Sequence, residues 1–382
     1  MKHLLVAWVT GFVFATFGCN SIVYGEKQNQ FEVLSVDSAK QDPNSKFVWY
    51  DAAAIGIEGK GWSDTDGHYT RLPENAKGVI SEDIWNLGKH SAGLYVRFAT
   101  DSNTILARWK LTGSGLSMFH MTSIGVSGLD LYMRDGDKWR EIGIGRPLKF
   151  PTNEDVLASG LKTGGKMNEY VLYLPLYNGV ESLEIGVAAG TKMAKGTAWP
   201  AGMKPIVIYG TSIVQGACAT RPGLAHTNIL QRRLNRPVIN LGFSGGARLE
   251  SEMADLLCQI DAAVYVLDPV PNSHVQLINE RFENFVTKIH NAHPKTPIIV
   301  CESICFPNTD YLAEQGTFKD NAALKSVYER LQSKGIKTMY YLKRNDYIGT
   351  DGEAFVDLVH PNDLGFMRMA DALEPILRKA MK

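Results

Sequence analysis

The chain has little of what marks several common protein classes. Its 40 Lys and Arg residues are matched by 40 Asp and Glu residues, so the formal net charge is zero. This balance, without any block of like charge, excludes the basic footprint of a nucleic-acid-binding protein and gives no charged interaction tail. Internal repeats are absent too. What remains is an ordinary globular composition, 45% hydrophobic, which is sufficient for a sizeable core.

Cysteine is scarce, with five residues in 382. Cys301 and Cys305 lie close together, but no further Cys or suitably spaced His accompanies them, so the sequence predicts no zinc site. Together with Cys218 and Cys258, they leave two interpretations open: buried thiols or one disulfide. The sequence cannot decide the connectivity of such cysteines.

One hydrophobic run stands out, at the N-terminus. A basic start precedes apolar residues 4–17, a run shorter than the ~20 residues that a membrane-spanning helix needs. This pattern is typical of a secretory signal. Because the run ends at Gly18-Cys19, residues 1–19 resemble a bacterial lipoprotein signal, in which the cysteine is lipidated and becomes the new N-terminus. Ordinary cleavage with release and a retained anchor helix are the alternatives.

The rest of the chain divides by its pattern of apolar residues. Residues 20–45 are polar and predict a flexible tether. Residues 46–200 contain short alternating runs separated by Gly, Asn, Asp and Ser, which predicts an antiparallel β-sandwich. Strand-like runs in this region lie at 94–98, 105–109, 170–174 and 183–187.

From residue 204 to 382 the pattern changes. Apolar runs rich in β-branched residues alternate with helical segments, which predicts a parallel sheet with helices on both faces. In such α/β sheets, ligands bind beyond the carboxyl ends of the strands. The expected strands lie at 206–209, 238–240, 263–267, 298–300 and 338–342, and the expected helices near 224–235, 246–259, 275–292, 316–333 and 364–380.

Two segments at this edge of the sheet carry residues for nucleophilic chemistry. Ser212 directly follows the first strand, and serine is a poor nucleophile unless a base takes its proton. The loop after the fifth strand supplies His360, with Asp357 three residues before it. The Asp357 carboxylate can then bind Nδ1 of His360 and leave Nε2 free to face Ser212, as in a catalytic triad.

Acyl transfer also needs hydrogen-bond donors for an oxyanion. The glycine-rich segment after the second strand includes Gly245, where backbone N–H can approach a ligand closely. The segment after the third strand ends in Asn272, which offers a side-chain N–H. Taken alone, Gly245 could be a helix-entry glycine and Asn272 a turn residue. Their order along four strand ends favours the catalytic interpretation.

The order of these residues along the chain (serine, glycine, asparagine, then aspartate and histidine) resembles that of the SGNH/GDSL hydrolases, over about residues 204–382. Ser212 matches the nucleophile of that family, and Thr211 stands where aspartate is usual. The resemblance implies a flavodoxin-like three-layer α/β fold, without metal or organic cofactor. By position it implies these roles: Ser212, Asp357 and His360 as the catalytic triad, and Ser212, Gly245 and Asn272 as the oxyanion hole.

The upstream region supports the same resemblance. Residues 128–132 read Gly-Leu-Asp-Leu-Tyr and resemble the Gly-x-Asp-Leu-Tyr (GxDLY) signature of a domain fused to such esterases. The resemblance implies a jelly-roll-like all-β sandwich. We expect this sandwich to contribute one wall of the substrate pocket, because the linker before residue 204 is short. Gln215 and Arg221, just beyond the nucleophile, are further candidates for lining the pocket.

The implied function is an exported serine esterase, secreted or held at the cell envelope, that removes acetyl groups from a polysaccharide or oligosaccharide. A lipid or aryl ester hydrolase is the enzymatic alternative. A surface glycan-binding protein with an inactive hydrolase domain is the non-catalytic one. Neither the acyl group nor the alcohol of the substrate can be derived from these motifs.

We predict that Cys19 carries lipid in the native bacterial host. Cys19→Ser removes the thiol to which the lipid would be attached, so the variant should move from the membrane to a soluble fraction. Cell fractionation measures this, with Cys258→Ser as the control that should stay on the membrane. A mature N-terminus other than Cys19, found by mass spectrometry, would contradict the prediction.

Overall fold

The computed structural model describes residues 31–382, except residues 42, 44, 305 and 312–315. The expected signal with Cys19, most of the expected tether, and Cys305 lie outside the described residues. The described cysteines, Cys218, Cys258 and Cys301, are free thiols. Within the described part of the chain, no helix has both the length and the apolar character to cross a membrane.

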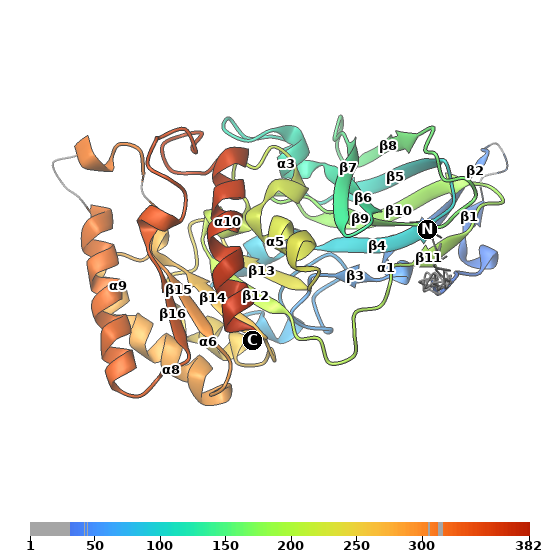
Figure 1. Cartoon of the computed structure of the whole chain (residues 1–382). Coiled ribbons are helices and arrows are strands. Elements are labelled where there is room, and N and C mark those ends of the chain that lie inside the picture. The colour runs from blue at the N-terminus through green and yellow to red at the C-terminus, as the bar shows by residue number, and fades with distance from the viewer. Residues whose placement is uncertain (1–30, 42, 44, 305, 312–315) are drawn as a thin grey trace, which may run out of the picture. The chain divides into compact units, whose positions relative to one another are not determined.

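The N-terminal half forms two antiparallel sheets, as the alternating runs predicted (Figure 1). One sheet has the order β1-β2-β10-β5-β8, and the other has the order β11-β4-β9-β6-β7, with β3 beside β4. Their bounds are β1 Lys40–Gln41, β2 Phe47–Asp51, β3 Ile57–Glu58, β4 Tyr95–Thr100, β5 Thr104–Leu111, β6 Leu129–Asp135, β7 Lys138–Gly145, β8 Thr152–Ser159, β9 Asn168–Tyr173, β10 Val180–Ala188 and β11 Met193–Lys195.

The two sheets pack face to face through alternate residues of their strands. Ile105, Ala107 and Trp109 of β5 lie in one buried cluster with Val96 and Phe98 of β4, which belongs to the other sheet. Because successive side chains of a strand point to opposite faces, this period of two fills the space between the sheets. Short helices that the sequence did not predict connect the strands: α1 Ala52–Ile55, α2 Glu82–Gly88 and α3 Ser123–Ser127.

The C-terminal half is a three-layer α/β structure with the strand order β13-β12-β14-β15-β16, all parallel. This is the flavodoxin-like order. Val207 and Tyr209 face a core with α6, α8 and α9, whereas Ile206 and Ile208 face one with α5 and α10 (Figure 1). The elements are β12 Ile206–Gly210, β13 Val238–Gly242, β14 Val264–Asp268, β15 Ile298–Cys301, β16 Met339–Leu342, α5 His226–Leu234, α6 Ser251–Leu257, α8 Glu283–Ala292, α9 Gly316–Ser333 and α10 Asp363–Ala380.

One helix begins later than its sequence pattern indicates. The expected helix at 246–259 is α6, which starts only at Ser251. Ala247 and Leu249 have φ of 56° and 59°, a left-handed conformation that a helix cannot contain. The preceding segment is therefore a loop beyond β13, which leaves its backbone available at the carboxyl edge of the sheet.

The sandwich and the α/β half share part of their hydrophobic core. Leu72, Ile80, Ile84 and Trp85, which precede β4, lie in the same buried cluster as residues of β12, β13 and β14. Burying apolar surface in this way stabilises by roughly 25 cal/mol per Å². We infer that neither half buries its apolar surface fully without the other.

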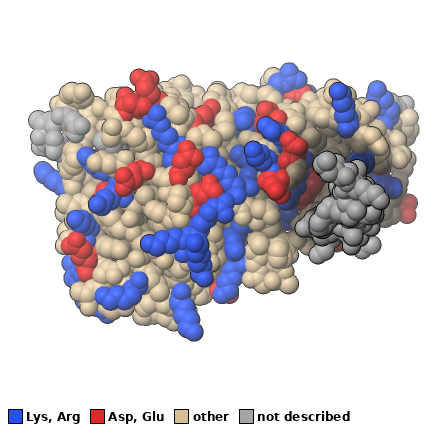
Figure 2. Space-filling model, in the orientation of Figure 1, with Lys and Arg blue, Asp and Glu red and all other residues tan. Residues whose placement is uncertain are grey.

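Basic and acidic side chains are both spread over the face that Figure 2 shows.

Arg71 ties the two halves together at their shared core. Its side chain is 1% exposed, and its guanidinium donates to the carbonyl oxygens of His90 at 2.9 Å and Leu87 at 2.7 Å. It also donates to the carbonyls of Asn240 at 3.2 Å and Gly242 at 2.7 Å, at the end of β13. Burial lowers the pKa of Arg71 to about 9, so the guanidinium remains charged at neutral pH.

We predict that Arg71→Leu lowers the free energy of unfolding by about 3 kcal/mol, because buried carbonyl oxygens lose their donor. Chemical denaturation measures the change. The control is Arg140→Leu, which removes an exposed ion pair with Asp135 and should cost less than about 1 kcal/mol. Equal denaturation midpoints for the two variants would show that Arg71 does not stabilise the contact between the halves.

Candidate active site

Ser212 lies at the start of a short helix directly beyond β12. This helix, α4 Ser212–Gln215, is capped by Thr211, whose hydroxyl accepts a hydrogen bond from the N–H of Ile213. The preceding Gly210 is tightly enclosed, since a Cβ there would lie 2.4 Å from a methyl group of Val214 and 2.6 Å from the carbonyl oxygen of Asp268. Only glycine lets the chain turn so closely from strand to helix. The turn leaves the Ser212 hydroxyl at the carboxyl edge of the sheet.

The three expected triad residues form a hydrogen-bonded line. Ser212 Oγ lies 3.0 Å from His360 Nε2, and His360 Nδ1 lies 2.7 Å from Asp357 Oδ2. The backbone N–H of His360 also donates to Asp357 Oδ1, at 2.8 Å. Burial raises the pKa of Asp357, but the hydrogen bonds from His360 outweigh it and hold that pKa below its ordinary value. An ionised Asp357 favours the proton on Nδ1, so Nε2 is the acceptor for Ser212.

The two expected oxyanion donors lie in neighbouring loops that contact each other. Gly245 has φ of +71°, and a Cβ there would meet nothing within 4 Å, so its backbone borders open space. Asn272 ends the short helix η4 Val270–Asn272, and its Nδ2 donates to the carbonyl oxygen of Gly246 at 2.6 Å. This bond uses one of the two N–H groups of the amide. The loops after β13 and β14 are therefore held together at Gly246, next to Gly245.

Gln215 and Arg221, the further candidates for lining the pocket, both contact the sandwich, and their role as pocket residues stays a prediction. Gln215 is fully buried, and its Oε1 accepts the N–H of Ser244 at 3.0 Å, next to Gly245. Its Nε2 lies 3.1 Å from His90 Nδ1 and donates to a carbonyl of the sandwich. Arg221 instead forms an ion pair with the buried Asp130. The loop that follows β13 and contains Gly245 is called the glycine loop below. The buried amide of Gln215 fixes this loop relative to both Ser212 and the sandwich.

The sandwich brings two residues to the triad that the sequence analysis did not connect with it. The ring centroid of His120 lies 5.3 Å from that of His360, and Tyr177 donates its hydroxyl to the carbonyl oxygen of Ser212 at 3.3 Å. Phe119, next to His120, is 94% exposed. His120 lies between β5 and α3, in a segment whose spacing to His360 carries no local pattern. Only the packing of the sandwich against the α/β half brings these residues together.

A cavity of about 800 Å³ begins at the proposed oxyanion loop. Ser244 and Gly245 line it from the α/β half, and Leu87 and His90 line it from the sandwich. Arg248 adds a charged side chain to the same wall. Burial and the neighbouring Arg71 lower the pKa of His90 to about 4, so His90 is neutral at pH 7. Both halves of the chain therefore line this cavity, but Ser212, Asp357 and His360 are not among its lining residues, so the sandwich wall of the substrate pocket stays a prediction.

One group of possible metal ligands occurs in the described residues. His120, Cys218, Asp357 and His360 each place one ligand atom within 4.8 Å of the others. Burial raises the pKa of the Cys218 thiol to about 12, which makes it a poor ligand at neutral pH. A cation there would also compete for the Asp357–His360 hydrogen bond. We therefore interpret the group as the surroundings of that pair and derive no chemistry through a metal.

Sequence comparison matches both halves of the chain to known families. A model of the GDSL-like lipase/acylhydrolase family matches residues 203–378. A second, describing the N-terminus of SGNH-hydrolase-type esterases and named for its GxDLY motif, matches residues 47–193. No curated protein matches the chain. The two matches meet near the change of pattern that the sequence shows at residue 204.

Structure comparison finds similar proteins of known structure. A Bacteroides ovatus protein assigned as a GDSL-like lipase is 35% identical, with a TM-score of 0.82 over 88% of this chain and 98% of that one. A salicylyl-acyltransferase from a tetracycline biosynthetic pathway is 16% identical, with a TM-score of 0.63 over 91% and 93%. A family two carbohydrate esterase from Clostridium thermocellum is 14% identical, with a TM-score of 0.53 over 75% and 90%. At such identities the last two show a shared fold only.

Proposed function

The chain belongs to the GDSL-like lipase/acylhydrolase family, of the SGNH esterase type, and on that premise we propose that Ser212, His360 and Asp357 are the catalytic triad of an ester hydrolase. One observation carries the proposal: the unbroken line from Ser212 Oγ to His360 at 3.0 Å and from His360 to Asp357 at 2.7 Å. A nucleophile bonded to a base that a third group orients is the arrangement that activates a hydroxyl.

In the proposed reaction, Ser212 Oγ attacks the ester carbonyl while His360 Nε2 takes its proton. Asp357 stabilises the resulting imidazolium. The N–H groups of Ser212 and Gly245 and the Nδ2 of Asn272 bind the oxyanion. His360 then protonates the leaving alcohol, and an acyl-enzyme forms on Ser212. Water, deprotonated by His360, attacks the acyl carbon in the second half and releases the acid.

For the substrate, we propose an acetylated polysaccharide or oligosaccharide. The cavity beside Gly245 combines apolar Leu87 with polar Ser244, Arg248 and His90, a mixture suited to sugar rings and hydroxyl groups. The distant carbohydrate esterase shares the fold. A lipase needs a large apolar surface to bind its substrate. The sequence of the hydrolase region shows no long amphipathic insertion that would form such a surface.

We also propose that the protein is exported and held at the cell envelope by lipid at Cys19. The basic start and short apolar run of the signal support this location. It would place the enzyme where polymeric carbohydrate is accessible. Residues 1–30 are outside the described part of the structure, so the proposal rests on the sequence alone.

We predict that Ser212→Ala and His360→Ala each lower kcat on p-nitrophenyl acetate by roughly 10⁴-fold or more, because the triad acts as a unit. Asp357→Ala should cost about 10- to 100-fold less than His360→Ala, because orientation is a smaller effect than proton transfer. Steady-state kinetics measure this. Ser333→Ala, at an exposed serine that ends α9, is the matched control and should keep native activity. Native turnover by a folded Ser212→Ala variant would refute the assignment.

We further predict that the protein releases acetate from acetylated polysaccharide and that its activity on p-nitrophenyl esters falls as the acyl chain lengthens. The reason is that the proposed cavity is polar enough for sugars and presents no large apolar channel. Acetate release and the series from acetate to palmitate are the two measurements. A preference for palmitate would instead favour the lipid ester alternative, and no turnover of either class would favour the non-catalytic glycan-binding alternative.

A further inference from the structure

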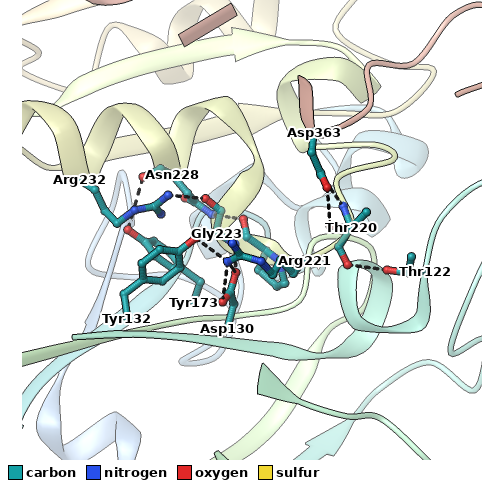
Figure 3. Close-up of polar contacts among 11 residues, drawn as sticks. Thr122, Asp130, Tyr132, Tyr173, Thr220, Arg221, Gly223, Asn228, Arg232 and Asp363 are labelled. Carbon is teal, nitrogen blue, oxygen red and sulfur yellow. Dashed lines mark hydrogen bonds and ion pairs between the residues drawn. The ribbon is translucent and has the colours of Figure 1, made fainter. Parts of the chain in front are cut away.

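Asp130 and Tyr132 of the GxDLY motif, residues 128–132, make a dense set of polar contacts with the α/β half (Figure 3). Asp130, at the centre of the motif, lies on β6 with a fully buried side chain. A buried carboxylate must find donors to remain ionised. Within the described part of the chain, the donors to Asp130 come from one segment, which follows the Ser212 helix.

Two donors of that segment hold the Asp130 carboxylate. Arg221 Nη1 donates to both oxygens, at 3.0 and 2.7 Å, and the N–H of Gly223 donates at 2.8 Å. Arg221 Nη1 also donates to the hydroxyl of Tyr132, at 2.5 Å. Burial raises the pKa of Asp130, so its charge depends on these partners. Asp130 and Tyr132, the Asp and the Tyr of the signature, thus accept hydrogen bonds from the same Arg221 guanidinium.

The fit around Gly223 is tight. A Cβ at this position would lie 2.4 Å from Tyr132 Cε2 and 2.6 Å from Asp130 Oδ2. Arg232 of α5 closes the arrangement, because it donates to the carbonyl oxygen of Gly223 at 2.8 Å and lies 3.9 Å from the centre of the Tyr132 ring. The backbone of this segment therefore has little freedom to shift relative to the sandwich.

A second bridge links this segment to the loop that carries His360. Thr122 of the sandwich donates its hydroxyl to the carbonyl oxygen of Thr220, at 2.5 Å. Thr220 in turn donates to Asp363 through its N–H at 2.9 Å and its hydroxyl at 2.6 Å (Figure 3). Asp363 is the first residue of α10, three positions after His360. Thr220 therefore joins the chain that follows Ser212 to the chain that follows His360.

We propose that Asp130, Arg221 and Thr220 are positioning residues, which hold the Ser212 turn and the His360 loop in register against the sandwich. In this arrangement the signature motif serves catalysis indirectly, through the separation of Ser212 Oγ and His360 Nε2. A displacement of about 1 Å between reacting groups can cost on the order of 10²-fold in rate. The inference rests on the proposed roles of Ser212 and His360.

The competing interpretation is that these contacts only stabilise the interface between the two halves. Removing one partner of a buried ion pair commonly costs about 3–5 kcal/mol, so a loss of stability in a variant does not by itself separate the two interpretations. The two interpretations differ in what a mild substitution does. A structural role predicts a lower melting temperature with native kinetics, whereas a positioning role predicts a lower kcat in a protein that remains folded.

Thr220 gives the cleanest test, because it is exposed and its substitution leaves the core intact. Thr220→Val removes the hydroxyl bond to Asp363 and keeps both backbone contacts, whereas Thr220→Ser keeps all three. Asp130→Asn removes the negative charge that pairs with Arg221 and so weakens the contact between β6 and the segment after Ser212. Glu169→Gln is the matched control, since Glu169 is a buried carboxylate of β9 that accepts from Arg134 at 3.3 Å and from the N–H of Thr197 at 2.8 Å, within the sandwich.

The full-length variants are compared by kcat and KM on p-nitrophenyl acetate, by the rate at which a fluorophosphonate labels Ser212, and by melting temperature. We expect Thr220→Val and Asp130→Asn to lower kcat and the labelling rate by about tenfold or more, with KM within about threefold. Thr220→Ser should stay close to native. Glu169→Gln should lower the melting temperature and leave kcat unchanged.

The outcomes separate this inference from the proposed function. A native protein that reacts with neither reagent would overturn both. A reactive native protein whose Thr220→Val variant keeps native kcat and labelling rate would overturn the positioning role alone. Loss of activity in Glu169→Gln equal to that in Asp130→Asn, at similar melting temperatures, would also overturn it. Should Asp130→Asn not fold, the Thr220 pair decides the question.

Discussion

The active site depends on bringing a histidine from the far edge of the sheet to the first strand. β16 lies three strands from β12 in the sheet order, roughly 14 Å at the usual strand spacing. The chain must therefore return across the carboxyl edge after Leu342 before His360 can meet Ser212. Such a long return needs fixed points. The Asp363–Thr220 contact is one, and the packing of α10 against α5 is another.

The same requirement explains why the sandwich is bound so firmly. Arg71 donates to the end of β13, Gln215 joins the glycine loop to His90, and Asp130 holds Arg221. Arg71, Gln215 and Asp130 are buried, and each contacts either the end of a strand of the parallel sheet or a segment that follows one. A β-sandwich that served only as a spacer would need none of them. The shared hydrophobic core around Leu72 and Ile84 makes the two halves one folding unit in this region.

The sequence predicted those parts of the site that local order determines. Ser212, Gly245, Asn272 and His360 each follow a strand, and parallel strands end at one edge. The meeting of Ser212 with His360, and the contact between the loops of Gly245 and Asn272, could therefore be inferred without coordinates. The role of Gln215 could not be inferred from the sequence, because its partners, His90 and Ser244, come from separate parts of the chain. The proximity of His120 to His360 is likewise set by packing alone. The late start of α6 was missed because left-handed Ala and Leu residues have no recognisable pattern.

The geometry of acyl transfer assigns different sides of Ser212 to different parts of the substrate. His360 must reach the leaving oxygen, so under the proposed mechanism the alcohol lies on the side of His120 and the exposed Phe119, both from the sandwich. Under the same mechanism the oxyanion would lie at Gly245, which lines the cavity. The sandwich therefore borders Ser212 on both sides, and under the proposed function a polymeric alcohol would contact the sandwich near His120 and again in the cavity.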